Sequence, residues 1–276
     1  MGLKDIFSVS NKNDSIGLCL SGGGALGFAH VGAIQALEDH GIFPEHVVGT
    51  SMGSIIGALY AAGYSPTEMM QLIKDDKLYK VTKLMTFTHS FLKVGLSNHS
   101  QLRSLIQELI PHNSFEQLKL KMHVCVVNLN KAEWEIISEG NELDKWVAAS
   151  ASIPGVFEAI QHDDTYFVDG GLLNNVPAQG LKDSCQTIIG VDVIPHIVPQ
   201  ELNKLIDTLA ASVRAMQHQN SKAGRDICSF VIEPKAIEKY HEFSFDAYQE
   251  IYQYGYSATV KYIVQHPEIL KLKREK

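Results

Sequence analysis

Apolar and polar positions follow two different periods along this chain, and the two kinds of segment alternate. Short apolar runs typical of buried strands occupy residues 16–20, 46–48, 122–128, 165–168, 187–193 and 227–232. Helical spacing marks 27–40, 54–62, 66–75, 101–110, 143–152, 201–223 and 245–264, the last with an interruption near Gly255. This alternation predicts a single α/β domain, in which helices flank a mostly parallel central sheet.

Two segments refine that prediction. Residues 133–138 alternate in polarity and follow the strand at 122–128 after Asn130 and Lys131, which predicts a hairpin. Residues 78–98 are less regular and mix large apolar side chains with Thr, Ser and Lys. We interpret them as a packed connection that contributes core side chains, with an apolar lid over an acyl pocket as the alternative.

Length and charge limit the class of protein. A chain of 276 residues with 45% hydrophobic content can bury one large core. The net charge of -7 gives no electrostatic reason to expect nucleic acid as a partner, because phosphate binding needs concentrated Lys and Arg. The basic cluster at 271–276 is interpreted as a solvated tail.

Cysteine usage and the N-terminal residues indicate a location. Cys19, Cys125, Cys185 and Cys228 show no C-x-x-C spacing, and three of them lie in apolar runs, as buried reduced thiols do. Charged residues interrupt the first 14 positions, which therefore lack the apolar core of a signal peptide. No stretch approaches the roughly 20 apolar residues of a membrane span. We expect a cytoplasmic protein whose contact with membranes, if it makes any, is peripheral.

The pattern that carries chemistry is Gly49-Thr50-Ser51-Met52-Gly53. It fits G-x-S-x-G, in which a nucleophilic serine occupies a sharp turn between a strand and a helix. The apolar run before it and the small-residue helix after it provide that context. At such a turn Ser51 meets backbone N–H groups and a helix dipole that favour negative charge. The alternative is an ordinary helix N-cap.

A glycine run, Gly22-Gly23-Gly24, follows the first predicted strand. A dinucleotide-binding loop is disfavoured, because no acidic residue ends a second strand about 20 residues later. A Walker phosphate loop is disfavoured because the run lacks the Gly-Lys-Ser/Thr ending. Backbone donors for an oxyanion fit better, since such donors are among the largest contributions to acyl transfer.

A general base has to accompany the serine. The 12 histidines include His30, His89, His99, His162, His196, His218, His241 and His266, and the context of none of them favours a catalytic role. Asp169 differs because it ends a predicted strand and precedes Gly170 and Gly171. A structural Asx-turn is the alternative. A pKa near roughly 3.9 makes an ordinary aspartate a weak base. The surroundings of Asp169 would therefore have to raise this pKa or align the carboxylate with the serine hydroxyl.

These elements, in this order, resemble the patatin-like phospholipases, including bacterial and neuropathy-target-esterase-like members. The matching segments are 21–27, 49–53, 149–157 and 169–171, and the resemblance covers about residues 15–195. It implies a three-layer α/β/α catalytic core at 15–195, preceded by an N-terminal extension at 1–14. Residues 196–276 would then complete the same domain with helices and a strand.

The resemblance also implies a mechanism. Family members use a Ser-Asp dyad without a catalytic histidine, which corresponds here to Ser51 as nucleophile and Asp169 as base. Gly22, Gly23 and Gly24 would line the oxyanion hole, and Gly49 and Gly53 would shape the nucleophile elbow. Substrates would be acyl esters of lipids, with no metal and no cofactor. Many members carry Arg or Lys where this chain has Leu26, so oxyanion stabilisation would rest on the amides.

Three hypotheses follow for the function. The first is a patatin-like serine acyl hydrolase of the lipase, phospholipase A or lysophospholipase type. The second is an α/β-hydrolase esterase with a Ser-Asp-His triad. The third is a non-catalytic lipid-binding or regulatory protein on the same fold, for which Leu26 is the sequence indication. The sequence specifies neither the lipid head group nor an oligomeric state.

Overall fold

One mixed sheet organises the part of the chain that the computed structural model describes, which comprises residues 15–75, 99–194 and 205–274. Its strands are β1 (Ile16–Leu20), β2 (His46–Thr50), β3 (Lys121–Asn128), β4 (Glu133–Ile137), β5 (Ile160–His162), β6 (Thr165–Asp169), β7 (Thr187–Val191) and β8 (Phe230–Ile232). The strand order is β5-β6-β3-β2-β1-β7-β8, and β4 also pairs with β3. The central strands β3, β2, β1, β7 and β8 run parallel, while β4, β5 and β6 add antiparallel pairs.

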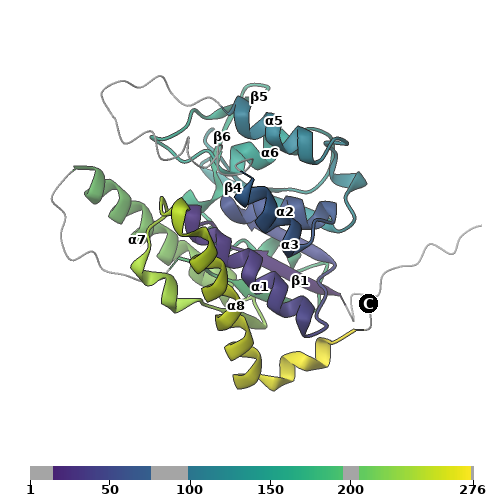
Figure 1. Cartoon of the computed structure of the whole chain (residues 1–276). Coiled ribbons are helices and arrows are strands. Elements are labelled where there is room, and N and C mark those ends of the chain that lie inside the picture. Colours follow the sequence, from purple (N-terminus) through teal and green to yellow (C-terminus); the bar gives the residue numbers. More distant parts are fainter. Residues whose placement is uncertain (1–14, 76–98, 195–204, 275–276) are drawn as a thin grey trace, which may run out of the picture.

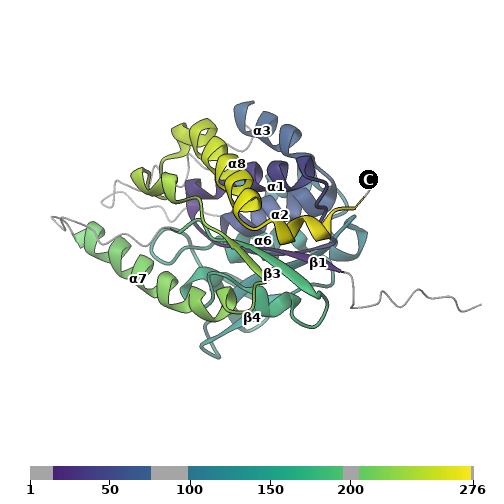
Figure 2. The same cartoon turned by 90° about the horizontal axis from the view of Figure 1, so that it is seen from below.

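Helices cover both faces of this sheet. They are α1 (Phe28–Asp39), α2 (Met52–Ala62), α3 (Pro66–Lys74), α5 (Ser100–Leu109), α6 (Leu143–Ser150), α7 (Leu205–Arg225) and α8 (Tyr248–Gln265). Short 3₁₀ turns lie at Gly24–Gly27, Phe115–Gln117, Gly170–Leu172, Ala178–Leu181, Lys235–Lys239, Phe245–Ala247 and Pro267–Leu272. Helices α1, α2, α3 and α8 lie on one side of the sheet and α7 on the other (Figures 1 and 2). The prediction of a three-layer α/β/α domain is therefore confirmed.

The two faces of β1 show why the sheet needs helices on both sides. Ile16, Leu18 and Leu20 point into the larger apolar core, which α1, α2 and α8 cover. Cys19, which points the other way, joins a smaller cluster with Val48 and Leu181. Successive side chains of a strand face opposite sides, so a strand that is apolar at every position must be buried on both.

The partners of β3 place two loops side by side. β4 occupies one edge of β3 from Val124 to Asn128. On the opposite edge, β2 pairs as far as Thr50 with Cys125, and β6 continues from Asp169 with Val126. Because a strand has only two edges, β2 and β6 share this one and meet end to end. The residue after β2 is Ser51, so the register brings Ser51 next to Asp169.

Three sequence predictions need correction. Residues 160–162 form the edge strand β5, where the sequence pattern predicted no strand. Strand β8 begins at Phe230, later than expected, because Asp226 and Ile227 form a turn after α7 and the two residues that follow belong to no strand. Helix α8 is continuous through Gly255, where glycine allows close approach to α1 and does not break the helix. The segment at 78–98, a candidate packed connection or lid, lies outside the described residues.

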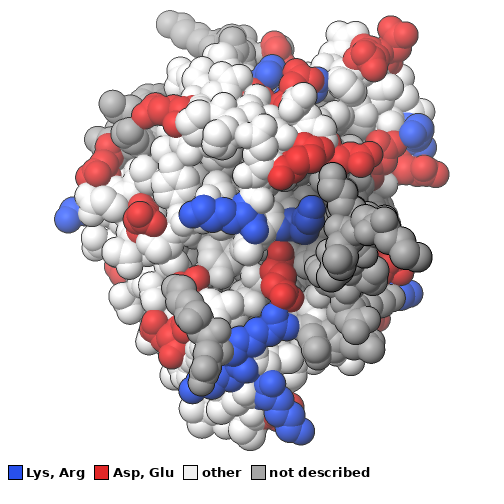
Figure 3. Space-filling view, turned by 90° about the vertical axis from the view of Figure 1, so that its right-hand side faces the viewer, with Lys and Arg blue, Asp and Glu red and all other residues white. Residues whose placement is uncertain are grey.

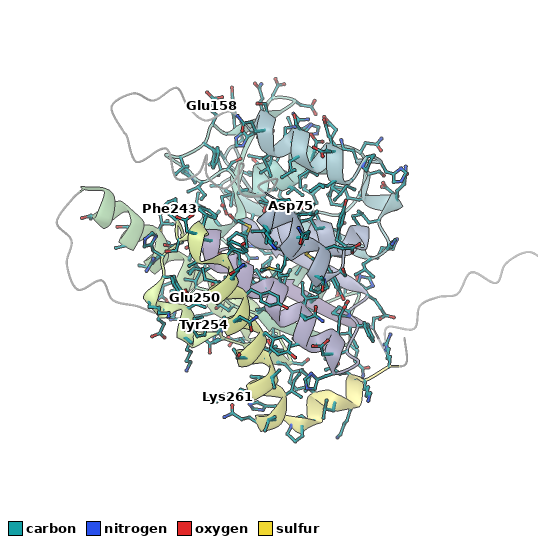
Figure 4. All side chains as sticks on the ribbon, viewed as in Figure 1. Asp75, Glu158, Phe243, Glu250, Tyr254 and Lys261 are labelled. Carbon is teal, nitrogen blue, oxygen red and sulfur yellow. The ribbon has the colours of Figure 1, made fainter. Side chains whose placement is uncertain are left out.

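The tyrosines of α8 attach this helix to the rest of the domain. Tyr248 packs edge-on against Phe28 of α1, with ring centroids 6.1 Å apart. The Tyr256 hydroxyl donates to Asp39 at the end of α1 at 3.0 Å. Tyr254 and Glu250 lie one helical turn apart (Figure 4), and the ammonium of Lys239 lies 4.9 Å from the Tyr254 ring centroid. Through these contacts the tyrosines form a packing face of α8.

The described surface carries both signs of charge. On the face in Figure 3, acidic and basic side chains intermix among neutral ones, and no continuous basic stripe crosses it. Such a surface gives no support to nucleic-acid binding. None of the helices within the described ranges combines the length and the apolar character that a membrane span requires.

Candidate active site

Ser51 lies at the point where β2 turns into α2. Its backbone has φ 53° and ψ -123°. This conformation is strained for any residue that carries a side chain. A Cβ atom on Gly49 would lie 2.3 Å from the Gly53 carbonyl oxygen, and one on Gly53 would lie 2.3 Å from the Leu20 carbonyl oxygen. Both positions therefore require glycine. The Ser51 side chain makes no capping hydrogen bond to α2, which rules out the N-cap interpretation.

A second serine, Ser150 at the end of α6, holds this turn. The Ser51 amide donates to Ser150 Oγ at 2.9 Å, and the Ser150 hydroxyl donates to the Cys125 carbonyl of β3 at 2.7 Å. The strained backbone is thus linked to the sheet through one buried hydroxyl. Sequence reasoning assigned no role to Ser150, although it lies in the segment at 149–157 that carried part of the family resemblance.

Asp169 ends β6 and is buried beside the serine. Its amide donates to the Ser152 carbonyl at 3.0 Å, and its Oδ1 accepts from the Gly171 amide at 2.7 Å. The Ser51 side chain lies near enough to the same carboxylate to lower its pKa. Burial raises the pKa of Asp169 to about 6, against the opposing effect of the Ser51 and Gly171 hydrogen bonds. The Asx-turn is therefore present, and the carboxylate contacts Ser51 as well.

The glycine run after β1 lies on the other side of Ser51. A Cβ atom on Gly22 would lie 3.2 Å from Ser51 Cβ, but the Gly22 amide donates to the Asn175 carbonyl at 3.3 Å. Within the described part of the chain, the amides of Gly23 and Gly24 make no hydrogen bond. Gly22 thus lines the site with its Cα, while Gly23 and Gly24 retain unpaired donors.

Neighbouring groups hold the glycine run in position. Ala25 donates its amide to the Glu242 carbonyl at 2.8 Å, so the chain just before α8 supports the run. His30 Nε2 donates to the Ser21 carbonyl at 2.8 Å, and burial lowers the pKa of this histidine to about 4, which keeps the ring neutral. Leu26 is fully buried in the core.

Asparagines connect the glycine run, the serine turn and the aspartate loop. Thr50 Oγ1 donates to the Asn174 carbonyl at 3.1 Å. The Asn175 amide donates to Asn220 Oδ1 at 2.9 Å, and Asn220 Nδ2 donates to the Gly171 carbonyl at 3.0 Å. Asn220 belongs to α7, far along the chain from the motifs, so no short sequence pattern could have identified it.

The histidines take other places. His99 Nε2 contacts the Glu158 carbonyl at 2.6 Å, and His162 Nδ1 lies 2.7 Å from Lys145 Nζ. His89 and His196 lie outside the described residues. In the described part of the chain, the partners of the Asp169 carboxylate are Ser51 and the Gly171 amide. Nor does a group of three or more His, Cys, Asp or Glu side chains there have the arrangement of a metal site.

The combined geometry matches the requirements of acyl transfer. A serine on a strained turn lies beside a carboxylate whose pKa is raised to about 6. The glycine run, in which two amides are unpaired within the described residues, lies on the other side of the serine. A nucleophile, a proton acceptor and donors for a developing oxyanion are the three groups that this chemistry needs.

Known proteins are similar to this chain in sequence and in fold. The family model described as "Patatin-like phospholipase" matches residues 18–182. "Lysophospholipase NTE1" of Meyerozyma guilliermondii is 25% identical over 284 residues, covering 89% of this chain and 19% of the relative. The protein of the same name from Saccharomyces cerevisiae is 30% identical over 185 residues, covering 66% of this chain and 11% of the relative. The chain thus spans a fifth or less of the length of these curated relatives.

A solved structure agrees at the level of the fold. VipD from Legionella pneumophila superimposes with a TM-score of 0.51 at 15% sequence identity, covering 92% of this chain and 67% of that one. The family model spans more than half of the chain and includes the glycine run, the serine turn and the aspartate loop. This chain belongs to the patatin-like phospholipase family.

Proposed function

We propose that this chain is a serine acyl hydrolase that cleaves fatty acyl esters of lipids through a Ser51-Asp169 dyad. The observation that carries the proposal is the position of the Ser51 side chain beside a buried carboxylate whose pKa is raised to about 6. A base with that pKa is half ionised near pH 6, and it gains a stronger drive to accept a proton than an ordinary aspartate has. Family membership supports the substrate class.

The proposed reaction begins with acylation. Ser51 Oγ attacks the ester carbonyl carbon while its proton passes to Asp169. Negative charge then develops on the carbonyl oxygen, within reach of the Gly23 and Gly24 amides, and the first-turn amides of α2 add their dipole. The leaving alcohol takes the proton from Asp169, and the acyl group remains on Ser51. Water then releases the fatty acid by the reverse sequence of proton transfers.

Lysophospholipids are the first substrates to test, because two of the related proteins carry that activity in their names. The family resemblance implies Arg or Lys at the position of Leu26, which is apolar and buried, so the amides would stabilise the oxyanion without a cation at that position. A substrate of this class resides in a membrane or micelle, which requires peripheral contact between the enzyme and that surface.

The test compares the parent with Ser51→Ala and Asp169→Asn, using a medium-chain aryl ester and a fluorophosphonate probe. We expect labelling and hydrolysis in the parent only, with turnover at least about 10³-fold lower in both variants. In the parent, kcat/KM should rise as pH increases through about 6, since the ionised Asp169 is the active form.

Asp192→Asn is the matched control. Asp192 is also a buried aspartate with a raised pKa that follows a strand, but it pairs with Arg225 at 2.7 Å. This variant should keep its labelling. A histidine variant as inactive as Ser51→Ala would instead support a triad. A folded parent that binds lipid but never labels would favour the non-catalytic alternative.

A further inference from the structure

Three polar side-chain atoms converge beside Gly171, in the loop that follows Asp169. A Cβ atom on Gly171 would lie 2.9 Å from Asn175 Oδ1, 2.9 Å from Gln217 Nε2 and 3.0 Å from Asp169 Oδ1. These atoms come from the aspartate loop, from the segment after it and from α7. The two acceptors, Asn175 Oδ1 and Asp169 Oδ1, and the donor, Gln217 Nε2, therefore lie close to one another.

Asn175 is unusual among these residues because its side chain is completely buried and unpaired. Neither Oδ1 nor Nδ2 has a hydrogen-bond partner in the described part of the chain. A buried polar group without a hydrogen-bond partner destabilises the folded protein. The backbone of the same residue is fully used, since its amide donates to Asn220 and its carbonyl accepts from Gly22. The protein thus fixes the main chain of Asn175 and leaves its carboxamide available.

The carboxamide oxygen of Asn175 lies near both Ser51 and Asp169. A Cβ atom on Gly22 would lie 2.6 Å from Asn175 Oδ1 and 3.2 Å from Ser51 Cβ. Two atoms that lie this close to a shared point are less than about 6 Å apart, a span that one water molecule bridges with two hydrogen bonds of about 2.8 Å. Asn175 Oδ1 satisfies this condition toward Asp169 Oδ1, and it lies within a similar distance of Ser51 Cβ, the carbon that carries the hydroxyl.

We propose that Asn175 orients the water that hydrolyses the acyl-enzyme, an inference that rests on the proposed function above. The water donates one hydrogen bond to Asn175 Oδ1 and one to Asp169, and it accepts one from Gln217 Nε2. Its remaining lone pair faces the acyl carbon on Ser51.

The step balances with the groups present. The water oxygen bonds to the acyl carbon as one of its protons passes to Asp169. The intermediate then breaks its bond to Ser51 Oγ, which takes the proton back from Asp169. The products are a free fatty acid and the original serine.

This role separates the two halves of the reaction. Acylation uses Ser51, Asp169 and the ester, so it proceeds without Asn175. Deacylation needs a water in a defined orientation, and losing that orientation slows only this half. Removal of the carboxamide should therefore make the acyl-enzyme accumulate.

The experiment is a rapid-mixing measurement of nitrophenolate release from a medium-chain p-nitrophenyl ester. In Asn175→Ala we expect a burst close to one nitrophenolate per enzyme, followed by a steady rate at least about 10-fold below that of the parent. The rate of fluorophosphonate labelling, which reports on Ser51 and Asp169, should stay within about 2-fold of the parent. Intact-protein mass spectrometry should show the acyl group retained on Ser51.

Asn174→Ala is the matched control, because Asn174 precedes Asn175, is equally buried and pairs its Nδ2 with Gln179 at 3.0 Å. It should show no added burst. Thermal melting reveals whether Asn175→Ala folds. If it does not, Gln217→Ala is the variant to test, because Gln217 is a half-buried residue of α7, and it should show a smaller burst.

The outcomes distinguish this inference from the proposed function. Equal losses of burst, labelling and turnover in folded Asn175→Ala would overturn the water-orienting role and assign Asn175 to acylation. Unchanged turnover would overturn it as well. A parent that neither labels nor hydrolyses would instead remove the proposed function, and with it the reaction to which this water belongs.

Discussion

Glycine brings two main chains together in two regions of this molecule, at the crossing of α1 and α8 and at the carboxyl ends of β1 and β2. At the helix crossing, a Cβ atom on Gly32 would lie 2.0 Å from the Tyr252 carbonyl oxygen, and one on Gly255 would lie 2.0 Å from the Ala29 carbonyl oxygen. Aromatic contacts and the Tyr256-Asp39 hydrogen bond complete that interface. Close approach there serves packing.

At the strand ends the same device serves chemistry. Gly49 and Gly53 allow a turn that places Ser51 in a strained conformation. The turn lies beside a buried carboxylate, Asp169, and near the buried carboxamide of Asn175, which has no hydrogen-bond partner within the described residues. Each of these features costs about 1–3 kcal/mol of stability. The difference teaches that substitutions at the helix crossing should affect folding, while some substitutions at the site should remove activity and yet stabilise the protein.

The largest expected effect on stability tests the helix crossing. Gly255→Val would place a branched side chain against the Ala29 carbonyl, which neither helix can avoid without separating. We expect a loss of more than about 3 kcal/mol in the free energy of unfolding, measured by urea denaturation. Ser257→Val, at an exposed position of the same helix, should lose far less. Equal losses in the two variants would show that the close approach does not govern this interface.

The next prediction concerns Asp169→Asn. Burial raises the folded-state pKa of Asp169 to about 6 from an ordinary 3.8, so ionising it in the folded protein costs about 3 kcal/mol above pH 6. Asparagine keeps the shape without the charge. The variant should be inactive and, at pH 8, more stable than the parent by up to about 3 kcal/mol.

The pH dependence gives this prediction its sign. The folded parent binds the Asp169 proton more tightly than the unfolded chain does, so the parent loses stability as pH rises from 3.8 through 6. The advantage of Asp169→Asn should therefore shrink as pH falls below 6 and vanish near 4. Denaturation curves of both proteins at pH 4, 6 and 8 measure it, and an advantage independent of pH would exclude desolvation as the cause.

The smallest predicted effect isolates backbone strain at the serine turn. Ser51→Gly and Ser51→Ala both remove the hydroxyl, but only glycine adopts φ 53° and ψ -123° without strain. At pH 5, where Asp169 is mostly protonated, the glycine variant should be more stable than the alanine variant by about 1 kcal/mol. If thermal melts show the alanine variant to be the more stable, the elbow does not store strain.

The sequence by itself determined the fold class, the strands at the centre of the sheet and the two motif residues of the proposed dyad. Strands such as β1 and β7 are apolar on both faces, and helices such as α1 have a regular apolar stripe, so their positions follow from local pattern. The serine turn also carries its own signature, because its glycines and its flanking elements are adjacent in sequence. The short edge strand β5 has no such pattern and was missed.

Only the tertiary structure decided how the site is held together. The end-to-end meeting of β2 and β6 along β3 depends on register, which no local pattern records. The residues that reach the site through hydrogen bonds or close contacts are Ser150 from α6, Asn175 from the segment after the aspartate loop, and Gln217 and Asn220 from α7. The raised pKa of Asp169 likewise arises from burial by residues distant in sequence. A motif identifies the proposed reacting groups, but their burial and hydrogen bonds depend on residues from many parts of the folded chain.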